Sequence, residues 1–312
     1  MERLTENKII LIVRKTRLDE LISRFNTEAQ ARFYIEHLGA DFLDYKREDE
    51  HYKASVREAQ QMLSRLGRLQ TVDRSYIPNF IFGAADTVVV LGQDGLVANT
   101  LKYLNEQPVV GVNPDPARWE GILLPFVVRD LPKVIPEVFS GRRSLSQVTM
   151  ARAELNNGQV LHAVNDFFIG AKSHISARYT IRAGTRQEQH SSSGIIVSTG
   201  MGSTGWFKSL MAGAAAIASA VSGVDVTTRI SKEIPWDADY LYFTVREPFS
   251  SKISQISLVF GKITRDQPLT LVSQMPESGV IFSDGIESDF LEFNSGAQAA
   301  IAPAEKNGRL VV

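Results

Sequence analysis

Cysteine is absent from this chain of 312 residues. Without thiols, the protein has no disulfide, no thiolate nucleophile, no zinc–thiolate site and no cysteine-bound iron–sulfur cluster. The formal net charge is only -1, so no strong positive field favours binding to nucleic acid. What remains is an ordinary globular composition, with 44% hydrophobic and 22% charged residues, and a length that suits two domains.

Long apolar runs and several well-known catalytic motifs are missing as well. The longest segment of small apolar residues, Met211 to Val221, is shorter than the roughly 20 residues that span a bilayer. A probable strand begins near Lys8 and leaves no room for a signal or transit peptide, so we expect a cytoplasmic protein. There is no Walker loop, nucleophile elbow or complete GxGxxG fingerprint, which excludes P-loop phosphoryl transfer and an ordinary Rossmann dehydrogenase. The five histidines lack the spacing of metal ligands, and we expect no metal site built from them.

Apolar β-branched runs alternate with helical spacing in the first 140 residues. Such runs are typical of strands buried on both faces, and they occur at Ile9–Val13, Val88–Leu91 and Val109–Asn113. We also expect a short strand at Asp41–Tyr45 and an exposed amphipathic helix at His51–Leu66. This alternation predicts an N-terminal α/β domain, doubly wound and Rossmann-like, over residues 1–140.

Short strands separated by turn residues dominate the chain after residue 140. One strand is expected to run through Val160–Ile169, and one helix, from Ser203 to about Val221, interrupts the series. This pattern predicts a C-terminal β-sandwich domain over residues 141–289. Residues 290–312 form a further segment that we expect to pack back on the first domain.

A glycine-bracketed acidic turn, Gly92-Gln93-Asp94-Gly95, follows the Val88 strand and precedes a helix. Gly92 and Gly95 lack Cβ atoms, so a phosphate or ribose can approach the backbone, and Asp94 lies near a helix N-terminus. A tight turn with a capping aspartate explains the same residues equally well. Both interpretations stay open on these residues alone.

The next strand is followed by a loop, residues 113–121, that carries Pro114 and Pro116. Two prolines stiffen this loop. Its Asp, Arg and Glu residues are candidates for ion pairs that hold the loop over the sheet, or for direct ligand contacts.

Two polar stretches in the second domain are also candidates for a binding site. Asn165-Asp166 interrupts an apolar run, and a buried polar pair needs a partner, either a ligand or the backbone at a bend in the sheet. The stretch from Thr199 to Gly205 joins a strand to a helix. In it, Ser203 and Thr204 are expected to cap the helix, and the glycines, Gly202 among them, favour an anion-binding turn.

Taken in order, these stretches resemble the NAD kinase family, within the superfamily that includes diacylglycerol kinases and phosphofructokinases. The matching motifs are Gly92-Gln93-Asp94-Gly95, Asn165-Asp166 and Thr199-Gly200-Met201-Gly202-Ser203-Thr204-Gly205. The segment from Gly111 to Gly121 and the run from Asn165 to Gly170 look like the mitochondrial-type branch. The resemblance covers residues from about 8 to 290.

The resemblance implies transfer of the ATP γ-phosphate to the 2′-hydroxyl of the adenosine ribose of NAD. Asp94 would be the catalytic acid and would help to organise Mg²⁺, while Gly92 and Gly95 would cradle phosphates. Asn165 and Asp166 would hold adenine and ribose, and Thr199, Gly202, Ser203 and Thr204 would hold nucleotide or phosphate groups. Family members are homodimers or higher oligomers.

Two departures from the family pattern motivate alternatives. Gln93 replaces the second glycine of the turn, and Leu96 replaces a threonine after it. A non-catalytic NAD(P)-binding protein on the same fold is one alternative, and a kinase for a lipid or sugar acceptor is another.

Overall fold

The computed structural model describes residues 4–226 and 234–312. The chain divides into two compact units: unit 1 is Met1–Ser146 with Arg309–Val312, and unit 2 is Gln147–Gly308.

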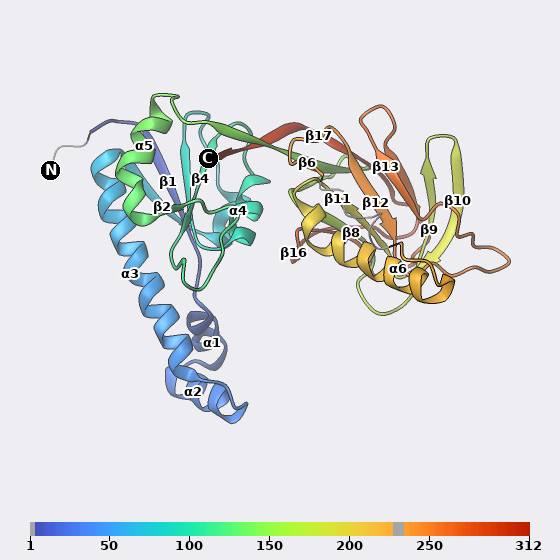
Figure 1. Cartoon of the computed structure of the whole chain (residues 1–312), viewed down its shortest axis with the longest axis horizontal. Coiled ribbons are helices and arrows are strands. Elements are labelled where there is room, and N and C mark those ends of the chain that lie inside the picture. Colours follow the sequence, from blue (N-terminus) through green and yellow to red (C-terminus); the bar gives the residue numbers. More distant parts are fainter. Residues whose placement is uncertain (1–3, 227–233) are drawn as a thin grey trace. The chain divides into compact units, whose positions relative to one another are not determined.

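Unit 1 is built on a parallel sheet (Figure 1). Its strands lie in the order β2, β1, β3, β4, and β5 also pairs with β4. They are β1 (Lys8–Val13), β2 (Arg68–Asp73), β3 (Thr87–Leu91), β4 (Pro108–Asn113) and β5 (Phe126–Val127). All five residues of β3 are buried, as expected for a strand covered on both faces.

Helices cover the two faces of this sheet. The helices α3 (Phe42–Leu66) and α5 (Leu131–Phe139) pack on one face, where Leu63 and Ile135 join Leu11, Val89 and other strand residues in one core. Helix α4 (Asp94–Leu101) lies on the other side of the strands (Figure 1). The doubly wound α/β arrangement predicted from the alternating pattern is confirmed.

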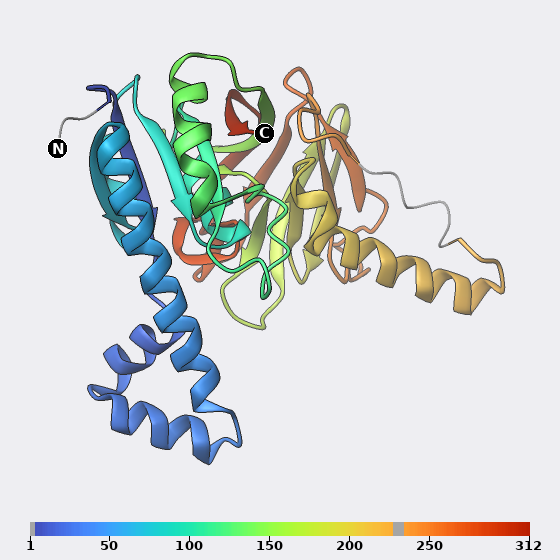
Figure 2. The same ribbon diagram turned by 60° about the vertical axis from the view of Figure 1, so that its left-hand side comes forward.

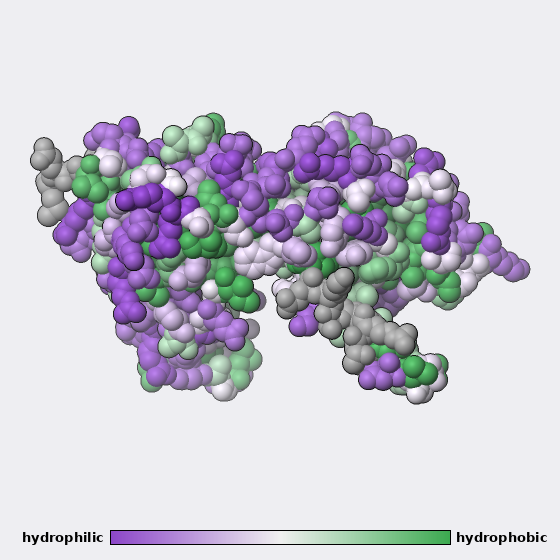
Figure 3. Space-filling view, turned by 45° about the horizontal axis from the view of Figure 1, so that its top comes forward, coloured by the Kyte–Doolittle hydropathy of each residue, from purple (hydrophilic) through white to green (hydrophobic). Residues whose placement is uncertain are grey.

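A helical extension projects from unit 1 (Figure 2). It consists of α1 (Arg17–Phe25), α2 (Glu28–His37) and the first turns of α3, held by a small cluster around Leu18, Ile35 and Phe42. Its visible surface is largely hydrophilic (Figure 3). The predicted strand at Asp41–Tyr45 is wrong, because Asp41 caps α3 by accepting the Leu43 N–H at 2.8 Å.

The chain between β2 and β3 forms a 3₁₀ helix, Arg74–Asn79, and a second 3₁₀ turn, Val128–Asp130, precedes α5.

The helix α3 is less exposed than its charged sequence predicts. It buries Tyr52, Ala59 and Leu63 against the sheet.

The last strand, β17 (Gln298–Val311), completes the sheet of unit 1. Arg309 and Leu310 pair in parallel with Pro108 and Val109 of β4. The side chain of Val311 is fully buried in the core of unit 1.

Unit 2 is a sandwich of two sheets. The first contains β10, β9, β14 and β17 in that order, with β6 beside β17 and β7 beside β6; the second runs β13, β12, β11, β8, β15, β16 and is antiparallel. The strands are β6 (Leu145–Leu155), β7 (Val160–Ala163), β8 (Asp166–Ala171), β9 (Ala177–Ala183), β10 (Arg186–Ser192), β11 (Ile195–Ser198), β12 (Leu241–Val245), β13 (Phe260–Ile263), β14 (Leu269–Ser273), β15 (Gly279–Ser283) and β16 (Ile286–Glu292).

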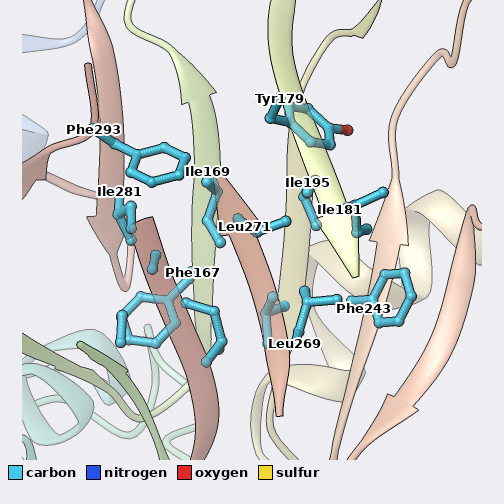
Figure 4. Packing of buried hydrophobic residues seen from close by; sticks show 14 of the residues in the cluster. Phe167, Ile169, Tyr179, Ile181, Ile195, Phe243, Leu269, Leu271, Ile281 and Phe293 are labelled. Atoms are coloured by element: carbon cyan, nitrogen blue, oxygen red, sulfur yellow. The ribbon is translucent and has the colours of Figure 1, made fainter. Parts of the chain in front are cut away.

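The core of the sandwich lies between its two sheets (Figure 4). Phe167, Ile195 and Phe243 of one sheet meet Ile181 and Leu271 of the other. Alternate residues of each strand point inward, which is the pattern that short strands with period 2 predict. The β-sandwich expectation is confirmed.

The predicted continuous strand Val160–Ile169 is wrong in one respect. It is two strands, β7 and β8, interrupted at Val164 and Asn165. After β11, a 3₁₀ turn (Gly202–Thr204) leads into α6 (Trp206–Ser222). Within residues 4–226 and 234–312, no helix has the length and apolarity needed to cross a bilayer.

Candidate functional site

The Gly92–Gly95 turn lies at the carboxyl end of β3, and α4 begins inside it at Asp94. Gln93 precedes the helix, and its carbonyl accepts the Leu96 N–H at 2.8 Å. The Gln93 side chain makes no capping hydrogen bond. The turn is therefore shaped by backbone contacts. The Gln93 side chain is partly exposed at the carboxyl end of the sheet.

The two glycines of the turn differ in their surroundings. A Cβ on Gly95 would meet nothing within 4 Å, and this residue is exposed. A Cβ on Gly92 would lie 2.7 Å from Leu96 Cδ2. Because Leu96 is buried, Gly92 has a packing role, whereas Gly95 leaves open backbone that a ligand can approach.

Asp94 is partly buried, and one of its carboxylate oxygens is held by the protein. Its Oδ1 accepts the Leu123 N–H at 2.7 Å, while Oδ2 has no hydrogen-bond partner among the described residues. Leu123 itself runs close over β4, because a Cβ on Gly111 would lie 1.9 Å from the Leu123 carbonyl oxygen. The hydrogen bond thus fixes the direction of the carboxylate and leaves one oxygen available.

Tyr52, which the sequence analysis missed, ties two strand ends together beside the turn. Its hydroxyl donates to the Leu91 carbonyl at 2.9 Å and accepts the Arg14 N–H at 2.9 Å. Burial raises the pKa of Tyr52 to about 12, so the hydroxyl stays protonated. A tyrosine on the apolar face of a helix is a weak signal for such a role, since it also suits an ordinary core residue.

The loop of residues 113–121 is anchored at both ends. Asn113 accepts the Asp115 N–H at 3.0 Å and donates to the Trp119 carbonyl at 2.9 Å. Arg118 forms a two-pronged ion pair with Asp44 of α3, at 3.1 and 2.5 Å. Arg118, followed by Arg17, lowers the pKa of Asp44 below its usual range. The predicted ion pairing is present: Arg118 also lies 3.7 Å from Asp115 within the loop, and the Asp44 carboxylate is contributed by α3.

A second polar cluster lies in unit 2 at the break between β7 and β8. Asp284, in the turn between β15 and β16, accepts the N–H groups of Val164, Asn165 and Asp166. The shortest of these bonds, to Asn165, is 2.7 Å. Asp284 N–H in turn donates to the Asp166 carbonyl at 3.0 Å. The partner that Asn165-Asp166 requires is therefore Asp284, a residue distant in the sequence that the sequence analysis did not single out.

The Asp166 carboxyl group is nearly buried. Burial, and to a lesser degree the charge of Asp284, raises the pKa of Asp166 to about 7. The Asn165 side chain beside it is partly exposed. At neutral pH this position therefore presents an amide and a carboxyl group that is close to its midpoint of ionisation.

The turn that begins at Thr199 packs on the same break. The Thr199 hydroxyl donates to the Val164 carbonyl at 2.5 Å, and the Thr199 N–H donates to the Asn165 carbonyl at 3.0 Å. A Cβ on Gly202 would lie 2.0 Å from the backbone carbonyl oxygen of Asn165. A Cβ on Gly200 would lie 1.9 Å from the backbone carbonyl oxygen of Pro235. Close backbone packing thus explains two of the three glycines.

The expectation that Ser203 and Thr204 cap the following helix is wrong. Their hydroxyls donate to the carbonyls of Gly200 and Met201, at 2.6 and 3.3 Å. The N-cap of α6 is Gly205, which has no side chain to accept a bond. A 3₁₀ turn separates the hydroxyl residues from the helix, so they stabilise the turn instead.

The structure thus groups the predicted residues in two clusters. Gly92, Asp94 and Gly95 lie together in unit 1, and Asn165, Asp166, Thr199, Gly202, Ser203 and Thr204 lie together in unit 2. Across residues 4–226 and 234–312, no group of three or more His, Cys, Asp or Glu side chains is arranged to hold a metal ion.

We next compared the chain with known proteins. No family model matches the chain. The chain is 26% identical over 243 residues to a probable NADH kinase of Oryza sativa subsp. japonica, covering 68% of this chain and 69% of the rice protein.

Solved structures share the fold. A crystal structure of yeast NADH kinase complexed with NADH has a TM-score of 0.57 at 18% identity, covering 99% of this chain and 84% of the yeast chain. An NAD kinase from Archaeoglobus fulgidus in complex with ATP has a TM-score of 0.55 at 14% identity, covering 98% of this chain and 93% of the archaeal chain. The chain is thus similar in sequence to a probable NADH kinase, and it shares with the two solved kinases the fold of an α/β domain followed by a β-sandwich.

Proposed function

We propose that this protein transfers the γ-phosphate of ATP to the 2′-hydroxyl of the adenosine ribose of NAD or NADH, forming NADP or NADPH. The observation that carries the proposal is Asp94, a carboxylate fixed by the Leu123 N–H at the open end of a parallel sheet, with Oδ2 available. The rice relative is named a probable NADH kinase, and the two structural neighbours were solved with NADH and with ATP.

In this proposal Asp94 acts as the general base. The 2′-oxygen forms a bond to the γ-phosphorus while the bond from that phosphorus to the bridging oxygen of ADP breaks. The proton of the 2′-hydroxyl passes to the Asp94 carboxylate. The open space at Gly95 leaves the turn backbone accessible to phosphate oxygens, and Gly92 shapes the turn by packing closely against Leu96.

The dinucleotide is assigned to the cluster in unit 2. Asn165 and Asp166 would hold adenine and ribose, since an amide and a carboxyl group together supply the donors and acceptors that these groups need. Thr199, Gly202, Ser203 and Thr204 would support nucleotide or phosphate groups through the backbone of their turn. The hydroxyl groups of Ser203 and Thr204 donate hydrogen bonds to backbone carbonyls of the turn, which supports a role for these two residues in fixing the shape of the turn.

Mg²⁺ fits the residues of this proposal. In phosphoryl-transfer sites it is usually bound by one or two carboxylates together with substrate phosphates. The Asp94 carboxylate would supply one such ligand together with the substrate phosphates, and no dedicated group of metal ligands would be required. When bound, Mg²⁺ neutralises charge on the phosphates.

The test is a coupled assay for NADP and NADPH after purified protein is mixed with ATP, Mg²⁺ and either NAD or NADH. Asp94→Asn keeps the side-chain shape, and we expect it to lower kcat at least ~100-fold because a general base contributes about that much. Asp41→Asn is the matched control, since Asp41 also accepts a backbone N–H, at the start of α3. Equal rates for Asp94→Asn and the wild-type protein would refute the assigned role of Asp94.

A binding protein without turnover is the second candidate. The observation that favours it is the pair of departures, Gln93 and Leu96: Leu96 is buried against Gly92 and offers no hydroxyl to a ligand. This candidate predicts that NAD(H) or NADP(H) raises the melting temperature while no ATP is consumed. A screen of lipid and sugar acceptors for ATP consumption separates a kinase with another acceptor from both.

The assembly and location are part of the same proposal. We infer a homodimer or higher homo-oligomer, in a cytoplasmic location that suits the cysteine-free composition. Sedimentation analysis of the purified protein tests the first statement, and cell fractionation tests the second.

A further inference from the structure

The Asp284 side chain makes hydrogen bonds that its own turn does not need. Asp284 and Gly285 both have positive φ, +54° and +69°, in the turn between β15 and β16. For such a turn, asparagine or glycine serves as well as aspartate. The carboxylate instead reaches a segment 118 to 120 residues away and accepts three consecutive backbone N–H groups.

Those three N–H groups need an acceptor because β7 and β8 are interrupted there. Val164 and Asn165 belong to neither strand, and unpaired N–H groups in a buried place are costly. A carboxylate is well suited to the position, since it only accepts hydrogen bonds and has four lone-pair directions. Ser283 adds to the attachment by donating from its hydroxyl to the His162 carbonyl at 2.6 Å.

The carbonyl side of the same segment is also held. Thr199 binds the carbonyls of Val164 and Asn165 through its hydroxyl, at 2.5 and 3.1 Å. The backbone of Val164–Asp166 is thus fixed between Thr199 and Asp284, while the side chain of Asn165 remains partly exposed.

We propose that Asp284 is a positioning residue that holds the backbone of Val164–Asp166 and so presents Asn165 and Asp166 to the dinucleotide. This inference rests on the proposed function for the identity of the ligand, but the attachment itself is independent of it. The negative charge of Asp284 also opposes ionisation of Asp166, which gives a second, measurable effect on the same residue.

The test compares Asp284→Asn with Asp266→Asn. Asp266 is an exposed residue of the loop between β13 and β14, so the control changes a loop aspartate that has no such attachment. In Asp284→Asn we expect the KM for the dinucleotide to rise about tenfold while kcat changes much less, because the binding residues move and Asp94 does not. We expect Asp266→Asn to behave as the wild-type protein.

A readout that needs no catalysis is the titration of the Asp166 carboxyl carbon by NMR. Removing the neighbouring charge lowers the pKa of Asp166 and shifts the amide signals of Asn165 and Asp166. If Asp284→Asn does not fold, Asp284→Gly replaces it, since glycine adopts the same φ and leaves room for water at the three N–H groups.

The outcomes separate the two proposals. Absence of NADP and NADPH formation by the wild-type protein would overturn the proposed function, and the titration would still decide the role of Asp284. An unchanged Asp166 titration together with unchanged amide signals in the variant would overturn the positioning role, whatever the kinase activity.

Discussion

The ionisation of Asp166 depends strongly on its surroundings. Its carboxyl group lies in a nearly closed part of unit 2 and near a second carboxylate, and its pKa is raised to about 7. Because the unfolded chain has the ordinary value of 3.8, the folded state binds the proton more tightly. The stability of unit 2 is therefore expected to decrease as pH rises from about 4 to about 7.

Asp166→Asn removes this dependence. Asparagine is neutral at every pH, so we expect the variant to gain stability relative to the wild-type protein as pH rises, by on the order of a few kcal/mol between pH 5 and pH 8. Urea unfolding at the two pH values measures the difference. A stability difference that is the same at both would show that Asp166 ionises normally in the folded protein.

At the scale of elements, the loop of residues 113–121 connects the helical extension to the turn that carries Asp94. Arg118 binds Asp44 of α3, and the chain that follows the loop supplies the Leu123 N–H bound to Asp94. Tyr52 of α3 contributes in parallel by holding the ends of β1 and β3. The position of Asp94 therefore depends on α3 as well as on its own strand.

Arg118→Ala tests this dependence. The ion pair is partly exposed, so we expect a loss of less than about 1 kcal/mol in global stability. We nevertheless expect faster hydrogen exchange at the Leu123 amide and a lower kcat, because the loop loses one anchor. Arg32→Ala, which breaks the surface pair with Glu36 on α2, is the control and leaves both readouts unchanged. Slow Leu123 exchange in both variants would contradict the anchoring role of Arg118.

At the scale of the molecule, the chain returns to unit 1 at its end. The last residues of β17 pair with β4, and Val311 lies fully buried among residues of β1, β3, α3 and α5. The fold of unit 1 thus requires a strand from the far end of the sequence.

Val311→Ala measures this requirement. Removing two buried methyl groups should cost unit 1 about 2 kcal/mol through lost burial and the cavity left behind. Val312→Ala is a closely matched control, since the neighbouring side chain is 45% exposed. Unfolding followed by the exchange of amides in β3 and β4 reports on unit 1. Similar effects of the two substitutions would show that the tail contributes little.

Local pattern was enough to predict much of this fold. The runs around Ile9, Val88 and Val109 are strands because β-branched residues favour extended backbone, whatever they later pack against. The prediction failed at Asp41–Tyr45, where a good capping aspartate starts a helix, and at Val164, where an apolar run is broken. In both places the deciding contacts involve side chain to backbone bonds that periodicity does not represent.

The sequence by itself determined the two fold classes, the order of the motifs and the family resemblance that this order implies. Those properties depend on residue type and spacing over short distances. Only the tertiary structure decided that Asp284 holds Asn165 and Asp166, that Tyr52 joins two strand ends, and that Gly200 and Gly202 are required by close backbone contacts. These are contacts between distant parts of the chain, and their physical basis is the pairing of buried polar groups, which exists only once the chain is folded.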